Sequence, residues 1–500
     1  MIKDIKSQLR ALLKYKSHKK RKGQLKIISA AVLVFLVLLF AASIIFSKYI
    51  FKAPTYQAQQ NNSADTLQAQ IFFNNNELDQ TFEKIIAEAL DEAKESIDIA
   101  MYSFNIFALK RDLYRAHERG VDVNIILSQN KYAQHQMIFD DLPQDIKIIH
   151  VGSQDDDYLS QYMHHKFIIV DKGTKNQKLI TGSVNLTEYQ ILFDPSYLFI
   201  TSDPYIIQTY TEEFNRLSQG YSGPDKLALN NYQPWAQHID YQDSFLDIYF
   251  SPGFKENNIN TKIAKLIAQA KEDIKIMAWQ ASDQNIAREI IKQAKQGLSI
   301  SIIADDTNFA DRYSIFPYLL RVKQEYQLDN LEIITDTWKS LDLYEEIPNE
   351  LVGNDFFNSF FHHHALIIDH HLVLFGTNNW SNMGSKINDE NIMISNNEYL
   401  VNNFEKVFAL HYTKLRNTSV NISLDDKEIE LDADIFTKYQ GHKMSIFAFD
   451  NFITQESDIC YETLTITDSK LKTKCENKIY DIYIHNQNGL IQAGNIVYKN

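Results

Sequence analysis

The feature that most constrains the fold of this chain is an internal duplication. The segment EAKESIDIAMYSF at 92–104 matches QAKEDIKIMAWQA at 269–281, and HERGVDVNIIL at 117–127 matches AKQGLSISIIA at 294–304. Both matches have the same offset along the chain. A sequence repeated in this way predicts one structural unit built twice, so we expect two copies of the same fold in tandem.

Each copy alternates apolar strands with amphipathic helices. In the first copy, apolar residues from Phe82 to Ala93 keep the spacing of one helix face. The next predicted helix ends at Gly120, and at Gly297 in the second copy, because glycine tolerates the left-handed conformation that often closes a helix. Helices alternating with buried strands predict two tandem α/β sandwich repeats. Residues 416–500 instead alternate short β-like runs with turn residues, which predicts a small β-rich C-terminal appendage.

The N-terminal segment has a composition of its own. Residues 27–46 carry no charge and are numerous enough to cross a bilayer as a helix. Basic residues are concentrated before this run and are sparse after it. The positive-inside rule therefore predicts a single-pass membrane protein with a cytoplasmic N-terminus and an extracytoplasmic remainder. A cleaved signal peptide is the alternative.

Charge and cysteine content limit the partners. The formal net charge of the chain is −14, which disfavours a long electrostatic track along a polynucleotide but allows one anionic group in a local basic pocket. The two cysteines are Cys460 and Cys475. A disulfide between them is one reading for an extracytoplasmic domain, and two free thiols are the other.

A polar motif occurs once in each copy, in MHHKFIIVD at 163–171 and FHHHALIID at 361–369, and each is followed by a glycine-hydroxyl-x-asparagine sequence. The corresponding positions are His164, Lys166, Asp171, Ser183 and Asn185 in the first copy, and His362, His364, Asp369, Thr377 and Asn379 in the second. The first two members of each set are two residues apart, so on a strand their side chains project from the same face. The adjacent His165 and His363 would then point away from it.

The pattern H-x-K-x4-D followed by G-[ST]-x-N, present twice, resembles the phospholipase D superfamily over roughly residues 67–415. The resemblance implies that the copies pack face to face about a pseudo-twofold axis and that their motifs meet in one active site without a metal or another cofactor. A phosphodiester needs a nucleophile, a proton donor and cations around its phosphoryl oxygens. The resemblance gives these roles to His164 as nucleophile, His362 as general acid and Lys166 as phosphate ligand.

The remaining motif residues receive supporting roles from the same resemblance. Asp171 and Asp369 would orient the imidazoles. Asn185 and Asn379 would donate to the phosphate, supported by Ser183, Thr377 and Glu390.

Two positions depart from the family pattern. His364 stands where a lysine is expected, and a neutral imidazole offers one donor and no charge. The acid that follows the second asparagine is present as Glu390, whereas the first copy has Ser196 at that position. Zinc ligation by His362, His364 and Asp369 is a competing reading of the histidine cluster.

These observations predict the following organisation: basic cytoplasmic tail 1–26, transmembrane signal anchor 27–47, linker 48–66, phospholipase D-like repeats 67–222 and 223–415, and β-rich C-terminal domain 416–500. The expected function is that of a membrane-anchored phospholipase D-type phosphodiesterase that hydrolyses or transfers phospholipid headgroups through a phosphohistidine. A nuclease acting on DNA or RNA ends and a catalytically decayed substrate-binding module are the alternatives.

Overall fold

The computed structural model describes most of the duplicated region and parts of the C-terminal region. The described residues are 66–74, 81–140, 142–154, 160–309, 313–336, 360–418, 422–425, 428–431, 440–441, 443–449, 460–465, 467–472, 474, 479–485, 491–493 and 497–498.

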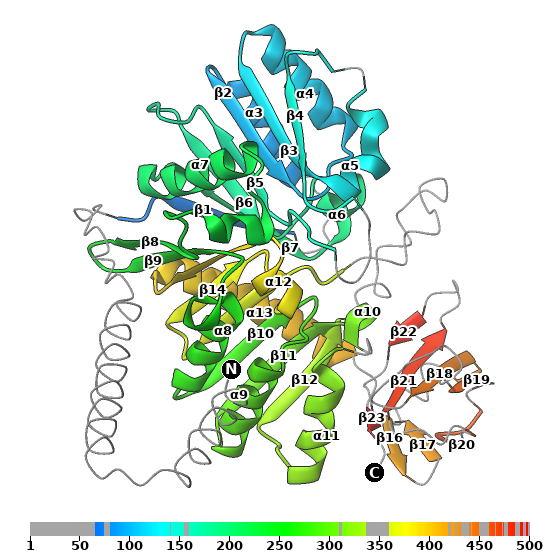
Figure 1. The fold of residues 1–500 in the computed structure, drawn as a ribbon. Coiled ribbons are helices and arrows are strands. Elements are labelled where there is room, and N and C mark those ends of the chain that lie inside the picture. Colours follow the sequence, from blue (N-terminus) through cyan, green and yellow to red (C-terminus); the bar gives the residue numbers. More distant parts are fainter. Residues whose placement is uncertain are drawn as a thin grey trace, which may run out of the picture. The chain divides into compact units, whose positions relative to one another are not determined.

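The first copy forms a seven-stranded mixed sheet (Figure 1) with strand order β1-β7-β6-β5-β2-β3-β4. Its strands are β1 (Ala69–Asn74), β2 (Ser96–Met101), β3 (Asp122–Ser128), β4 (Lys147–Val151), β5 (Lys166–Val170), β6 (Lys178–Gly182) and β7 (Ser196–Thr201). The strands β2, β3 and β4 are parallel, and the remaining pairs are antiparallel. Every residue of β2 and β5 is buried, as expected for strands covered on both faces.

The second copy repeats this topology. Its eight-stranded sheet has the order β12-β11-β10-β13-β14-β15-β9-β8, so it follows the first sheet strand for strand and adds β8 at one edge. Its strands are β8 (Trp235–Asp240), β9 (Phe245–Phe250), β10 (Asp273–Ala278), β11 (Ser299–Asp305), β12 (Leu331–Asp336), β13 (His364–Ile368), β14 (Leu372–Gly376) and β15 (Asn391–Ser395). The duplication predicted from the sequence is therefore present in the fold.

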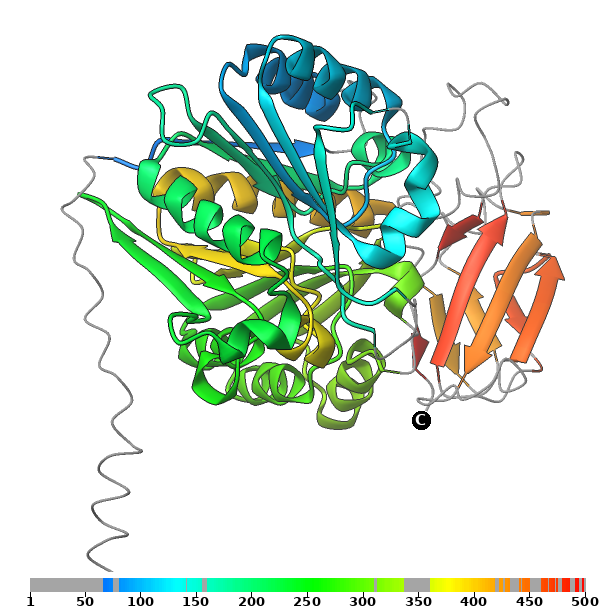
Figure 2. The same cartoon turned by 45° about the horizontal axis from the view of Figure 1, so that its top comes forward.

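Amphipathic helices connect the strands. In the first copy they are α3 (Thr81–Glu92), α4 (Phe107–Glu118), α5 (Gln129–His135), α6 (Glu188–Phe193) and α7 (Pro204–Ser218), with the short helices η1 (Gln136–Ile138) and, between the copies, η2 (Gly223–Ala228). In the second copy they are η3 (Lys255–Asn257), α8 (Ile259–Gln269), α9 (Gln284–Lys295), α10 (Asp306–Phe309), α11 (Phe316–Tyr326), α12 (Asn382–Lys386) and α13 (Glu398–Thr418). Figure 2 shows α3 and α4 together over one face of the first sheet.

Local sequence explains where these helices start and stop. Asp203 caps α7 by accepting from two backbone N–H groups, and Pro204 follows it in the first turn. Asp283 and Asn258 cap α9 and α8 in the same manner. Gly297 has a φ of +94° just beyond α9, which is the left-handed position predicted for it.

Three apolar clusters form the core. One joins α3 and α4 to the first sheet and one joins α8, α9 and α11 to the second. The third contains residues of both copies, among them Phe167, Tyr197, Phe375 and Phe404. The inner faces of the two copies are thus packed against each other, so loops from both copies can contribute to one site.

Short strands follow α13 in the C-terminal region. One sheet has the order β16-β17-β20, and another has the order β19-β18-β21-β22 with β23 paired to β21. Their bounds are β16 (Ile422–Asp425), β17 (Glu428–Leu431), β18 (Lys443–Phe449), β19 (Cys460–Thr465), β20 (Lys470–Lys472), β21 (Ile479–His485), β22 (Ile491–Ala493) and β23 (Val497–Tyr498). That 416–500 forms a separate domain stays a prediction. The predicted disulfide gains no support, because Cys475 lies outside the described residues.

The predicted localisation requires a correction. Within the part of the chain that the structure describes, no helix is both long and apolar enough to cross a lipid bilayer. We therefore withdraw the prediction of a single-pass membrane protein with an extracytoplasmic catalytic domain. The tail 1–26, the segment 27–47 and nearly all of the linker 48–66 lie outside the described residues.

Candidate active site

His164 and Lys166 lie at the start of β5 in the first copy. The Lys166 Nζ atom is 3.1 Å from His164 Nε2 and also donates to the His164 carbonyl oxygen at 3.0 Å. Both side chains therefore lie on the same side of the chain, as their spacing predicted. Only 4% of His164 and 1% of Lys166 is exposed, so the amine and the imidazole lie side by side and are both shielded from bulk solvent.

A carboxylate from the second copy orients His164. The Nδ1 atom of His164 is 2.7 Å from Glu390 Oε2, and Thr377 Oγ1 donates to the same oxygen at 2.7 Å. A backbone hydrogen bond also joins the two copies here: His164 N donates to the Asp389 carbonyl oxygen at 2.9 Å. Each half of the molecule therefore completes the environment of a histidine in the other half.

His362 occupies the corresponding place before β13. Its backbone N–H donates to the Pro195 carbonyl oxygen at 2.9 Å, and its Nδ1 atom is 3.9 Å from Asp194 Oδ2. The sequence comparison placed Ser196 opposite Glu390 and so missed Asp194, which reaches His362 from two residues earlier. The signal was the acid in FDPSYL, displaced from the position where the second copy has its glutamate.

His364 lies beside His362, with 5.2 Å between the ring centroids. Only 1% of it is exposed, and neither ring nitrogen has a hydrogen-bond partner among the described residues. Burial lowers the pKa of His364 well below its usual range, and the nearby His362 and Lys166 lower it further. The side chain at the lysine's position is therefore a neutral imidazole at neutral pH.

The role expected for Asp171 and Asp369 is corrected by the structure. The Asp171 carboxylate accepts hydrogen bonds from the backbone N–H groups of Lys94, Glu95 and Ser96 at 2.7–3.1 Å. Asp369 does the same for residues 271–273. These aspartates come after the far ends of β5 and β13, so they do not orient the imidazoles. They fix the turn between a helix and a strand instead.

The glycine of each G-[ST]-x-N sequence permits close strand contact. A Cβ atom on Gly376 would stand 2.2 Å from the Asn391 carbonyl oxygen, and one on Gly182 would stand 2.0 Å from that of Tyr197. The absence of a Cβ atom lets β14 approach β15 closely enough for Thr377 to reach Glu390.

The other residues of these sequences lie nearby and make different contacts. Ser183 Oγ accepts from Tyr197 N at 3.2 Å, and Asn185 Nδ2 donates to Gln190 Oε1 at 2.7 Å. Asn379 lines a cavity next to the histidines. Direct contact of Asn185 and Asn379 with a phosphate stays a prediction.

A buried network of charged side chains lies next to the segment that contains His164 and His165. His165 Nε2 is 3.0 Å from Glu213 Oε1, so His165 points away from His164 as predicted. Lys226, from η2 between the copies, lies 2.5 Å from the same Glu213 oxygen and 2.7 Å from Asp389 Oδ1. All three ionic side chains are fully buried. Burial alone would raise the pKa of Glu213, but Lys226 and His165 outweigh it and hold that pKa low.

Burial also shifts the groups that face the site. It lowers the pKa of Lys166 to about 7, against the attraction of Glu390. It raises the pKa of Glu390 to about 8, against the neighbouring Lys166 and the Thr377 hydroxyl. For His164 and His362, burial lowers the pKa well below the usual range, and Lys166 adds to that effect. Burial thus disfavours charge on every member, and an anion entering the site would favour their protonated forms.

Residues of both copies line a cavity of about 680 Å³. Tyr102, Tyr162 and His164 contribute from the first copy, and Trp279 and Asn379 contribute from the second. Tyr102 and Trp279 each present a ring edge-on to the histidine of their own copy, at centroid distances of 4.7 Å to His164 and 5.4 Å to His362. The cavity gives a substrate access to His164.

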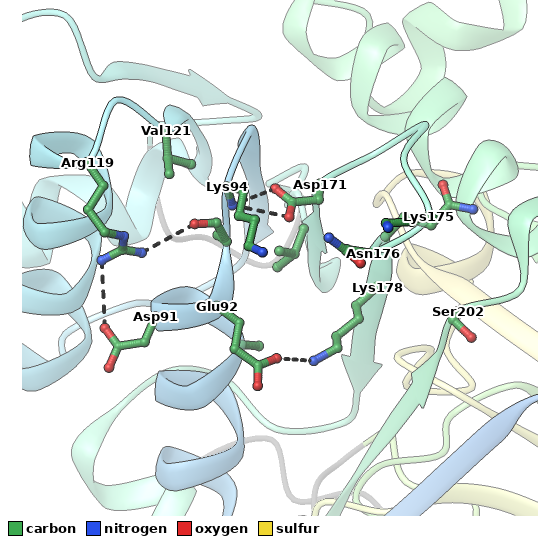
Figure 3. Close-up of a pocket in the computed structure, with 14 residues that line it drawn as sticks. Asp91, Glu92, Lys94, Arg119, Val121, Asp171, Lys175, Asn176, Lys178 and Ser202 are labelled. Atoms are coloured by element: carbon green, nitrogen blue, oxygen red, sulfur yellow. Dashed lines mark hydrogen bonds and ion pairs between the residues drawn. The ribbon is translucent and has the colours of Figure 1, made fainter.

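A second cavity, of about 790 Å³, surrounds Asp171 at the other end of β5 (Figure 3). Four of its charged side chains pair with one another: Lys178 lies 2.6 Å from Glu92, and Arg119 lies 3.9 Å from Asp91. With Asp171 bound to backbone amides, this cavity shows no arrangement for catalysis. Among the described residues, no cluster of three or more His, Cys, Asp or Glu side chains is placed to hold a metal ion.

Comparison with known proteins agrees with this geometry. The model of a family described as "Cardiolipin synthase, PLD-like domain" matches residues 86–218 and 263–412, more than half of the chain. A mitochondrial cardiolipin hydrolase from Xenopus tropicalis is 32% identical over 145 residues, covering 29% of this chain and 63% of that protein. A phospholipase D from Rickettsia conorii is 30% identical over 131 residues, 26% of this chain and 61% of the relative. The chain thus matches less than two thirds of the length of these relatives.

A solved structure supports the fold of the duplicated region. The phosphatidylserine synthase of Haemophilus influenzae superposes with a TM-score of 0.51 at 14% identity, covering 72% of this chain and 92% of that one. Fold and site together define a duplicated α/β protein whose two motif histidines are each approached by an acid from the opposite copy. The chain belongs to the phospholipase D superfamily and carries its phospholipase D-like domain.

Proposed function

We propose that this protein is a phospholipase D-type phosphodiesterase that hydrolyses or transfers a phospholipid headgroup through a phosphohistidine on His164. The observation that carries the proposal is the 2.7 Å contact between His164 Nδ1 and Glu390 Oε2. As an acceptor, the Glu390 oxygen holds the proton on Nδ1 and leaves the Nε2 lone pair for attack on phosphorus. Asp194 stands farther from His362, at 3.9 Å, which favours His164 as the nucleophile.

The two histidines divide the proton transfers. His164 Nε2 forms a bond to phosphorus while the bond to the leaving oxygen breaks, and that oxygen takes a proton from His362. A water molecule, or an alcohol in a transfer reaction, then attacks the phosphohistidine and gives its proton to His362. The phosphoryl group leaves His164, and both imidazoles return to their starting forms.

Lys166 supplies the cation for the phosphoryl oxygens. Its Nζ atom lies 3.1 Å from His164 Nε2. An incoming phosphodiester would draw Lys166 onto its own oxygens and free the Nε2 lone pair for attack. The anion would also raise the pKa of Lys166 and His362 from their lowered values, so the substrate itself favours the protonated forms that the reaction needs.

The choice of phospholipid as substrate rests on the relatives. A mitochondrial cardiolipin hydrolase and a phospholipase D match parts of the chain. The cavity also suits a glycerol-like segment of a headgroup, because aromatic rings and amides form much of its wall.

The test is turnover by the purified full chain with EDTA present throughout. Vesicles containing headgroup-labelled phosphatidylglycerol or cardiolipin are offered in parallel with labelled single-stranded DNA. We expect headgroup release by the wild type and by His370→Ala, an exposed control, and none by His164→Ala. A base-stable, acid-labile phosphate adduct on His164 should be trapped by mass spectrometry.

Other outcomes would select a different function. Cleavage of DNA without lipid turnover would replace the proposal by a nuclease. Activity lost in EDTA would indicate a metal, and no turnover of either substrate would favour a binding module without catalysis.

A further inference from the structure

The two copies contribute different kinds of residue to the wall of the active-site cavity. The second copy contributes Arg321, Tyr318 and Tyr313 from the α10–α11 region, in addition to Trp279 and Asn379. Arg321 is the one Arg or Lys among the described lining residues, and no Asp or Glu is among them. In a chain with a formal net charge of −14, a cavity wall with a cation and no carboxylate indicates an anionic occupant.

Arg321 is held in place by an aromatic ring, and no acid among the described residues neutralises it. It follows Tyr318 by three residues on α11, so both side chains lie on one face of the helix. The guanidinium carbon is 5.2 Å from the Tyr318 ring centroid, which orients the planar group by a cation–π contact. No described Asp or Glu forms an ion pair with it. The planar fork of donors is therefore available to bind two oxygens of one anionic group.

Two buried polar atoms on the same wall point to a ligand as well. The Trp279 Nε1 atom and the Asn379 Oδ1 atom are buried and have no hydrogen-bond partner among the described residues. A buried polar atom without a partner costs free energy, so its persistence needs an explanation. A bound polar group with hydroxyls would supply an acceptor for the indole N–H and a donor for the amide oxygen.

We propose that this cavity is a headgroup subsite that selects diesters whose leaving alcohol carries a second anionic group, with Arg321 as its counter-charge. The inference rests on the proposed function, because it takes the histidine pair as the place where the first phosphate binds. Trp279 and Asn379 hold the hydroxylated segment between the two anions. A headgroup with a quaternary ammonium would place a cation against Arg321 and is disfavoured.

Binding to the full chain tests the subsite without requiring turnover. Two probes are compared by calorimetry: glycerol 1,3-bisphosphate, which can fill both positions, and glycerol 3-phosphate, which can fill one. We expect the wild type to prefer the bisphosphate by about tenfold or more, as for a charge-assisted pair. Arg321→Gln should lose most of that preference. Arg288→Gln, which removes the same charge from α9 outside this cavity, should keep it.

Each result has a distinct meaning. A preference that survives in Arg321→Gln overturns the subsite. If Arg321→Gln loses the preference but the wild type cleaves no lipid, the subsite stands and the proposed lipid hydrolysis is wrong. If a 5′-phosphorylated thymidine dinucleotide binds more tightly than glycerol 1,3-bisphosphate and depends more on Arg321, the occupant is a nucleotide and the headgroup assignment is wrong.

Discussion

Two acidic residues that the sequence assigned to the site are expected to have different roles. Glu390 is expected to support catalysis, and Asp171 is expected to stabilise the fold. Glu390 contacts His164 at 2.7 Å, whereas Asp171 binds backbone amides at the far end of β5. Replacing Glu390 by Gln removes a carboxyl group that can ionise to support the positive charge formed on His164. We expect kcat for a soluble diester such as bis(p-nitrophenyl) phosphate to fall about 100-fold or more, with little change in KM.

Asp171→Asn is the matched control for this prediction. Asn tolerates the φ of 51° at this position, but it cannot accept three backbone N–H groups with a full charge. We expect a loss of stability of about 1–3 kcal/mol, seen as a lower Tm, while kcat of the folded protein stays near the wild-type value. A loss of kcat as large as that of Glu390→Gln would restore an orienting role for Asp171.

His364 offers a gain-of-charge experiment. Burial lowers its pKa well below the usual range, so the wild-type site has Lys166 as its cation near the phosphate, and Lys166 itself has a pKa lowered to about 7. The wild-type kcat/KM should therefore fall as pH rises above about 7, where the free enzyme loses this charge. His364→Lys should lower KM several-fold near pH 6 and lose that advantage at alkaline pH.

The control adds the same charge away from the phosphate. His370 is 59% exposed, so His370→Lys should leave both KM and the pH profile unchanged. If His364→Lys also changes neither quantity, His364 does not face the substrate phosphate.

At the scale of elements, the sequence predicted the strands that carry the histidines but not their contacts. The repeat and the apolar alternation were local signals, and both sheets formed with the expected order of strands and helices. The acids behind the imidazoles were harder to predict, since Glu390 and Asp194 reach across from the other copy. The orienting role of Asp171 and Asp369 came from the family resemblance. In the structure, a strand separates each aspartate from the histidines and places it at the opposite end of that strand.

The connection η2 is the element that links the two copies through charge. Lys226 is fully buried between Glu213 and Asp389. Both acids contact the segment that holds His164: Glu213 bonds to His165, and the Asp389 carbonyl oxygen accepts from His164 N. Lys226→Met would remove the cation that two buried carboxylates share, so we expect a loss of about 3–5 kcal/mol in the free energy of unfolding. Denaturant unfolding measures this quantity.

An exposed ion pair provides the comparison. Lys265 pairs with Glu256 on the surface, where both side chains are more than half exposed. Lys265→Met should change stability by about 1 kcal/mol or less. Equal effects of the two substitutions would mean that the buried network contributes no more than a surface pair.

At the scale of the whole molecule, the fold is symmetric and the site is not. The two sheets share their strand order, yet the first copy kept the lysine and the second kept the glutamate that contacts a histidine. Because each copy supplies what the other lacks, neither is expected to act alone. The aromatic wall with Arg321 belongs mainly to the second copy, which gives the site a direction for binding an asymmetric diester.

The buried histidines should also make the whole molecule sensitive to acid. Burial lowers the pKa of His164, His362, His363 and His364 well below the usual range. Below about pH 6.5 the unfolded chain protonates these side chains and the folded protein does not, so stability decreases as pH falls. Each contributes up to about 1.4 kcal/mol per pH unit. Glu390 acts in the opposite direction, because its raised pKa of about 8 keeps it protonated in the folded protein.

A single substitution isolates one histidine from these opposing effects. His363 is fully buried, stacks on Tyr197 at a centroid distance of 6.2 Å, and faces away from the substrate cavity. In His363→Leu the decrease in Tm between pH 6.5 and pH 5 should be smaller than in the wild type, because the unfolded chain takes up one proton fewer. His370→Leu, at an exposed position, should keep the wild-type slope. An unchanged slope in His363→Leu would mean that His363 takes up its proton in the folded protein, and that this buried face of the second copy admits charge more readily than its packing indicates.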